Sequence, residues 1–89
     1  MSTSAMCAAE VLAGIAALGR ERLGFTGALT PETRLVEDLQ LDSIQLLTLA
    51  IEVENRFQVR IAPDEEAGVA TLGDLVAIVH GKLAADAAG

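Results

Sequence analysis

The sequence predicts an all-α fold, a small four-helix bundle with a long first loop and a short third helix. The chain has 89 residues and is 52% hydrophobic, yet Phe25 and Phe57 are its only aromatic side chains. Leu, Ile, Val and Ala must therefore build the core, which suits packed helices better than sheets. Apolar residues also recur at helical spacing in three segments, and a chain of this length forms one domain.

The first helix is expected from about Ser4 to Leu23. Its apolar residues recur at three- and four-residue spacing, at Val11, Leu12, Ile15 and Leu18. Gly24 and Gly27 are expected to end it, since glycine is favoured just past a helix C-terminus.

A long loop is expected from Phe25 to Asp42, where Pro31 interrupts the chain and no helical period is sustained. Unpacked loops of this length are uncommon in compact domains. The apolar residues of this loop are therefore expected to tie it to the core: Phe25, Leu29, Leu35, Leu39 and Leu41.

The second helix has the clearest pattern. Asp42 is expected to cap its first turn, and Gln45 stands three residues on, as in a capping box. One apolar stripe is expected to face the core and comprises Leu46, Leu49, Val53 and Phe57. A second apolar row lies partly off that face and comprises Ile44, Leu47 and Ile51. This second row has no obvious burial partner in so small a domain.

Two further helices are expected. Pro63 followed by three acids is a favourable opening for a short third helix. Thr71 and Asp74 are expected to cap a last helix that ends at about Leu83 or Ala84. Its apolar positions are Leu72, Leu75, Val76, Val79 and Leu83. A single domain over residues 1–85 and a frayed tail over residues 86–89 are expected.

The formal net charge of −7 is concentrated in one region, because residues 35–66 hold eight acids against only Arg56 and Arg60. A negative field of this kind repels phosphate backbones, and the chain has no Trp or Tyr to stack on bases. Nucleic acid is therefore excluded as a partner, and a basic protein surface is expected instead.

The sequence indicates neither a disulfide-bonded protein, nor a metal-binding protein, nor a membrane protein. Cys7 is the only cysteine and no Cys/His spacing is typical of a metal site, which fits a reducing cytoplasm. The apolar start lacks a preceding basic residue and is interrupted by Glu10, so no export signal is expected. No apolar run reaches the length of a membrane span.

Ser43 begins the second helix directly behind Asp42, but no group in the sequence is placed to activate it. The only histidine is His80, near the end of the last helix, and it has no defined acid partner. The carboxylates lie at helical intervals and form a solvated acidic face, not an acid/base pair. No catalytic residue is assigned, and the protein is not expected to be an enzyme.

From Leu35 onward the chain resembles the acyl carrier protein family. The matching words are LVEDLQLDS, then ENRF, then Ile61, an acid-rich turn and TLGDLV, in that order and spacing. The resemblance is weak over residues 1–30 and strong over residues 35–76. It implies a four-helix carrier-protein bundle, in a chain that acts alone and as a monomer.

In that family the serine of the Asp-Ser pair receives a 4′-phosphopantetheine arm from coenzyme A, and the arm carries an acyl group as a thioester. The resemblance makes Ser43 this serine. It needs no internal base, because a separate phosphopantetheinyl transferase performs the attachment. What Ser43 needs is exposure, and the start of a helix also favours the phosphodiester charge. The resemblance further implies that Asp42 helps to position the metal of the transferase.

The second helix departs from common fatty acid carriers, because Gln45, Thr48 and Asn55 stand where such carriers usually have carboxylates. The expected partner-binding residues are Ile44, Gln45, Leu47, Thr48 and Ile51. Partners would be a loading enzyme and a downstream synthase or transferase of polyketide or specialised fatty acid metabolism. Two alternatives remain open: an aminoacyl carrier loaded by an adenylating ligase, and a helical interaction module with an unmodified Ser43.

Overall fold

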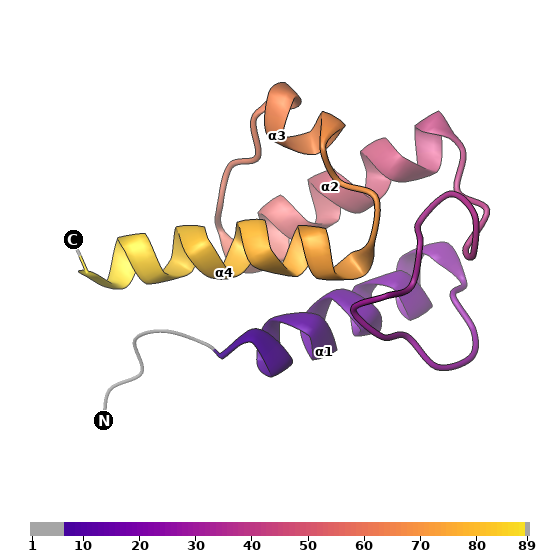
Figure 1. Cartoon of the computed structure of the whole chain (residues 1–89), viewed down its shortest axis with the longest axis horizontal. Helices are drawn as coiled ribbons and strands as arrows, with labels where there is room; N and C mark the ends of the chain where they lie inside the picture. Colours follow the sequence, from indigo (N-terminus) through magenta and orange to yellow (C-terminus); the bar gives the residue numbers. More distant parts are fainter. Residues whose placement is uncertain (1–6, 89) are drawn as a thin grey trace.

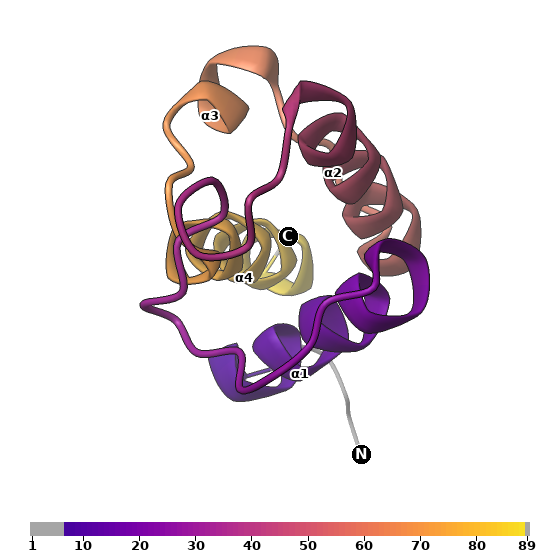
Figure 2. The same cartoon turned by 90° about the vertical axis from the view of Figure 1, so that its right-hand side faces the viewer.

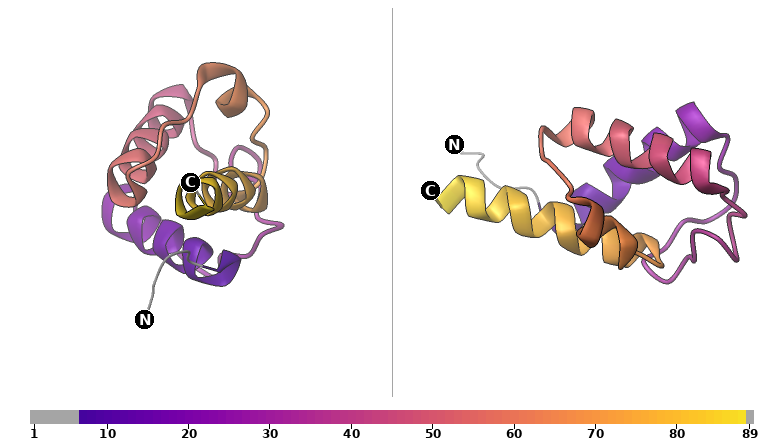
Figure 3. Two further views of the ribbon diagram at one scale, coloured as in Figure 1. Left: turned by 90° about the vertical axis from the view of Figure 1, so that its left-hand side faces the viewer. Right: turned by 90° about the horizontal axis from the view of Figure 1, so that it is seen from above.

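Three longer helices surround a common core in the computed structural model, which describes residues 7–88 (Figures 1 and 2). The helical elements are α1 (Ala8–Leu18), η1 (Gly19–Leu23), α2 (Ser43–Phe57), α3 (Pro63–Ala67) and α4 (Leu72–Ala88). Helix α1 packs against both α4 and α2. The short α3 lies above the first half of α4 (Figures 1 and 3). The all-α prediction is confirmed, and none of the described helices is long and apolar enough to cross a membrane.

Apolar side chains from every longer helix, from the first loop and from the link between α2 and α3 form the core. Its buried members are Val11, Ile15, Leu18, Phe25, Leu35, Leu41, Leu49, Val53, Phe57, Val59, Ile61, Leu72, Leu75, Val76 and Val79. Leu29, Leu39 and Leu46 are partly buried against them. The prediction that the loop is tied to the core through its apolar residues is therefore confirmed, as is the inward stripe of α2.

The predicted start of the first helix at Ser4 is wrong. Cys7 has an extended backbone, and the Glu10 carboxylate accepts a hydrogen bond from the Cys7 N–H at 2.9 Å. The helix therefore begins at Ala8, and the part of the prediction that covers Ser4 to Met6 lies outside the described residues. Helical backbone continues through η1 to Leu23, and Gly24 ends it with φ 73°. The predicted end is confirmed.

Phe25 packs closely against Gly19, just after the first helical segment ends. A Cβ atom on Gly19 would overlap the Phe25 ring. The Phe25 N–H donates to the Gly19 carbonyl at 3.1 Å, so the chain folds back onto the helix here. Glycine at position 19 lets the ring reach the core immediately after the helix ends.

Helix α4 begins as predicted but ends later. The Asp74 carboxylate accepts the N–H groups of Ala70 (2.9 Å) and Thr71 (3.1 Å), and these bonds lower the pKa of Asp74. The Thr71 hydroxyl in turn accepts the Asp74 N–H at 3.1 Å. The predicted end at Leu83 or Ala84 is wrong because α4 continues to Ala88. Alanine is the strongest helix former, and this segment is rich in it.

A short backbone pairing, which the helical pattern did not predict, attaches the first loop to the start of α4. Arg34 and Thr71 form an isolated antiparallel bridge. The Leu35 N–H donates to the Ala70 carbonyl at 3.0 Å, and the Leu72 N–H donates to the Thr33 carbonyl at 2.9 Å. These bonds hold the first loop, which leads into α2, against the start of α4.

Gly19 and Gly81 are both helical glycines but have opposite surroundings, since nothing lies within 4 Å of a Cβ built on Gly81. Gly19→Ala is expected to lower the free energy of unfolding by about 1–3 kcal/mol through overpacking against Phe25. Gly81→Ala is expected to raise it by about 0.5–1 kcal/mol, because alanine is the better helix former. Urea unfolding measures both. A shift of the same sign in both variants would contradict the packing at Gly19.

Candidate functional site

Ser43 is the first residue of α2, and its side chain is exposed. Asp42 caps the helix: its carboxylate accepts the Gln45 N–H at 2.8 Å. The Gln45 side-chain oxygen accepts the Asp42 N–H at 3.1 Å, which completes the predicted capping box. The two reciprocal bonds hold Ser43 between them, at a fixed place on the surface.

The backbone around Ser43 offers hydrogen-bond donors. The Leu46 N–H donates to the Asp42 carbonyl at 2.9 Å, and the Gln45 N–H is bound by the cap. Within residues 7–88, the N–H groups of Ser43 and Ile44 have no protein acceptor. Free N–H groups at a helix N-terminus, together with the helix dipole, favour an anionic group such as a phosphodiester.

Leu41 directs the chain into this geometry. It is buried, two residues before Ser43, and its N–H donates to the Leu35 carbonyl at 3.1 Å. Gln40 precedes it with φ 58°, in the left-handed region that a residue with a Cβ seldom adopts. The chain thus turns sharply to bury Leu41 and then emerges at Ser43. The hydroxyl is exposed because its neighbour is anchored.

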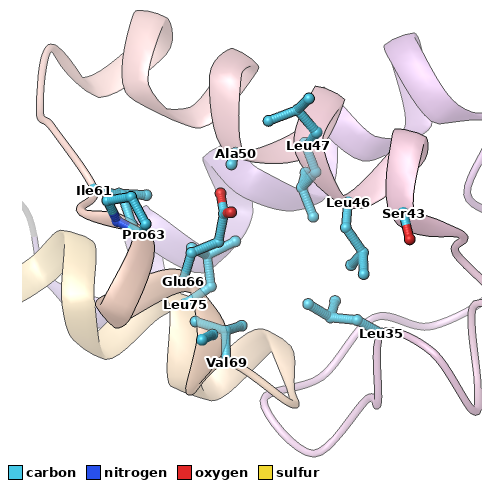
Figure 4. A pocket seen from close by; sticks show the side chains of 12 residues that line it. Leu35, Ser43, Leu46, Leu47, Ala50, Ile61, Pro63, Glu66, Val69 and Leu75 are labelled. Atoms are coloured by element: carbon cyan, nitrogen blue, oxygen red, sulfur yellow. The ribbon is translucent and has the colours of Figure 1, made fainter.

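An apolar pocket of about 360 Å³ opens beside Ser43. Its lining comes from the first loop, α2, α3, the chain on either side of α3, and α4. The lining residues are Leu35, Ser43, Leu46, Leu47, Leu49, Ala50, Ile61, Pro63, Glu66, Ala67, Val69 and Leu75. Figure 4 shows Ser43 and Leu35 at one end, Ile61 and Pro63 at the other, and the Glu66 carboxylate between them. The attachment candidate therefore stands at the end of an apolar enclosure.

The pocket could not be identified from the sequence. Its lining residues are spread from position 35 to position 75, and four of them, Leu35, Leu46, Leu49 and Leu75, were predicted only as core. No sequence pattern assigned a role to Ala50 or Val69. The pocket exists because α3 stands apart from α2 and leaves space between them.

Helix α3 has no buried residue of its own and is held by polar contacts. The Glu65 carboxylate accepts the Ala62 N–H at 2.9 Å and pairs with Lys82 of α4 at 3.0 Å. The Ala62 hydrogen bond and Lys82 together lower the pKa of Glu65. One acid thus fixes both the start of α3 and its position over α4.

The second apolar row of α2 is exposed, as its position off the core face suggested. The exposed fractions are 75% for Ile44, 54% for Leu47 and 45% for Ile51. Thr48 and Gln45, the polar members of the predicted partner face, bond within their own helix. The Thr48 hydroxyl donates to the Ile44 carbonyl at 2.9 Å, and Gln45 completes the capping box. The apolar members are therefore the large exposed side chains of this face.

The remaining candidate side chains lie away from Ser43. His80 is half-buried on α4, and Cys7 is exposed at the start of α1. Neither lines the pocket beside Ser43. Among the described residues, no three His, Cys, Asp or Glu side chains are grouped as a metal site would need.

Comparison with known proteins identifies this arrangement. Residues 13–79 match the family described as the phosphopantetheine attachment site. The meromycolate extension acyl carrier protein of Mycobacterium tuberculosis is 37% identical over 72 residues, which are 80% of this chain and 63% of that protein. An acyl carrier protein of Arthrobacter is 37% identical over 71 residues, 79% of this chain and 88% of that protein.

A solved structure supports the same assignment. It is a Mycobacterium tuberculosis chain assigned to the acyl carrier proteins, 27% identical, with a TM-score of 0.71. The match covers 84% of this chain and 96% of that chain. The matched family region includes the capped serine, the exposed row of α2 and the walls of the pocket, and we conclude that the chain belongs to the phosphopantetheine-binding acyl carrier protein family.

Proposed function

We propose that this chain is a stand-alone carrier that holds an acyl group as a thioester on a 4′-phosphopantetheine arm attached to Ser43. One observation carries the proposal: an exposed serine, fixed by a capping box, stands at the end of an apolar pocket of about 360 Å³. As a member of a carrier family, the protein presents a reacting group to enzymes and is not itself an enzyme.

The residues at Ser43 suit the arm. The hydroxyl is exposed to an external transferase, and the N–H groups of Ser43 and Ile44, which have no acceptor among residues 7–88, would hold the phosphodiester. When attached, the arm supplies the thiol that forms the thioester. The protein supplies the fixed point of attachment and the charge environment of the phosphate.

The pocket gives the carrier a second task. Ten of its twelve lining residues are apolar, so an acyl chain that enters it leaves water, at a gain of about 25 cal/mol per Å² of apolar surface. A chain held there is also less accessible to water and to unrelated enzymes. We therefore infer that cargo is enclosed between α2 and α3 while the carrier moves between partners.

The partners proposed are a phosphopantetheinyl transferase that takes the arm from coenzyme A, a loading enzyme and a downstream synthase or transferase. Specialised fatty acid metabolism in the cytoplasm is favoured, because several relatives are named for meromycolate extension. The exposed row Ile44, Leu47 and Ile51 would dock them by apolar contact, and the chain would act as a monomer. An aminoacyl cargo and an unmodified interaction module are the alternatives that the tests below separate.

Ser43 is expected to be the sole attachment site. Incubation with coenzyme A and a broad-specificity phosphopantetheinyl transferase should add one arm, seen as a single increment in intact mass, and Ser43→Ala should abolish it. Protein isolated from its native host should carry an acyl adduct. An aminoacyl adduct would select the first alternative, and a chain that no transferase modifies would select the interaction module.

Asp42 is expected to act both as a cap and as a charge that the transferase uses. Asp42→Asn keeps a good cap, whereas Asp42→Ala should lower the free energy of unfolding by about 1 kcal/mol. Both should slow arm attachment by at least about tenfold, if the carboxylate helps to hold the metal of the transferase. Attachment to Asp42→Asn at the normal rate would show that Asp42 is only a cap.

Ile51 is expected to contact the transferase, because it is exposed on the face of α2 that carries Ser43 and does not line the pocket. Ile51→Asp should lower kcat/KM for arm attachment by about tenfold, the equivalent of about 1.4 kcal/mol. Ala84→Asp adds the same charge at an exposed site on α4 and should leave the rate unchanged. Equal rates for both variants would remove Ile51 from the docking surface.

A further inference from the structure

Glu66 is the only charged residue among those that line the pocket beside Ser43. Figure 4 shows its carboxylate on the α3 side, pointing toward Ala50 across the space between the two helices. The other polar lining residue is Ser43 itself, at the end of the pocket. An acyl chain that runs from Ser43 toward Ile61 would therefore pass the Glu66 carboxylate.

The orientation of α3 places Glu66 there. Pro63, Glu66 and Ala67 are three and four residues apart, so they share one helix face, and all three line the pocket. Glu65 lies on another face and is held by Lys82 and by the Ala62 N–H. This pair sets the rotation of the short helix, and with it the direction of Glu66.

The Glu66 carboxylate is not committed elsewhere. Within residues 7–88, its side chain has neither an ion pair nor a hydrogen-bond donor. An ionised carboxylate accepts hydrogen bonds and cannot donate them. Glu66 is exposed, so the pocket lies on one side of its carboxylate and solvent on the other. A second carboxylate held beside it is repelled as a like charge, and salt screens this repulsion.

We propose that Glu66 selects the cargo of this carrier, favouring acyl chains that bear a hydroxyl or amine donor and rejecting chains that end in a carboxylate. The inference rests on the proposed carrier function. A hydroxyl or amine on the acyl chain donates a hydrogen bond to the carboxylate. A plain alkyl chain covers one side of the carboxylate and offers no such bond, and a dicarboxylic chain adds like-charge repulsion. Glu66 is thus a specificity-determining residue that touches the cargo and not the thioester.

The test compares three eight-carbon cargoes: octanoyl, hydroxyoctanoyl and the dicarboxylic suberyl chain. Each is attached to Ser43 as a preformed acyl-phosphopantetheine by the transferase, and complete loading is checked by intact mass. Enclosure is measured from the NMR shifts of the methyl groups of Leu46, Val69 and Leu75, which line the pocket. The midpoint of thermal unfolding gives a second measure of enclosure for each cargo.

The wild-type protein is expected to enclose the hydroxylated chain best and the suberyl chain least. In the wild type, the ratio of enclosed to open cargo should be lower for suberyl than for octanoyl. Glu66→Gln should raise this ratio for suberyl by about tenfold relative to octanoyl, since the repulsion is removed. Asp64→Asn is the matched control, because Asp64 is an exposed acid of the same helix that does not line the pocket. It should leave the order of the three cargoes unchanged.

Several outcomes would overturn the inference. Suberyl enclosed as well as octanoyl in the wild type would show that Glu66 does not discriminate, and an equal effect of Asp64→Asn would assign the selection to general charge. Fully loaded protein whose pocket methyl groups do not shift with any cargo would refute the cargo role of the pocket while the carrier function stands. A protein that the transferase leaves unmodified would refute both together.

Discussion

The attachment of the first loop to α4 is the constraint on which the site depends. Backbone bonds between Leu35 and Ala70 and between Thr33 and Leu72 fix the loop, and Leu35 and Leu41 bury their side chains on either side of its last turn. Each such burial contributes about 1.5–3 kcal/mol. Because Leu41 is anchored, α2 must begin directly after it, with Ser43 on the surface and the pocket beneath.

Most of the acids of residues 35–66 also make local structural contacts. Glu37 and Asp38 pair with Arg34, which lowers the pKa of Asp38. Asp42 and Glu65 cap helices, Glu52 pairs with Arg22 at 3.6 Å, and Glu54 accepts the Ile61 N–H at 2.7 Å. Each contact is local or partly exposed and of modest strength. Together they orient the short segments that the small core cannot hold.

The exposed apolar row and the pocket share one helix, α2. Leu47 is half exposed on the outer row of α2 and also lines the pocket, whereas Ile44 and Ile51 belong to the outer row alone. A partner that contacts Leu47 therefore presses on a wall of the enclosure.

The sequence by itself determined the helices, the cap and the serine, because these depend on neighbours three or four residues away. Asp42 and Gln45 specify the start of α2, and the spacing of Leu49, Val53 and Phe57 specifies its inward face. Only the tertiary structure decided the bridge between Arg34 and Thr71, the pocket, and the direction of Glu66. These arise where segments distant in sequence meet, and helical periodicity records which residues turn inward but not which segment they will face.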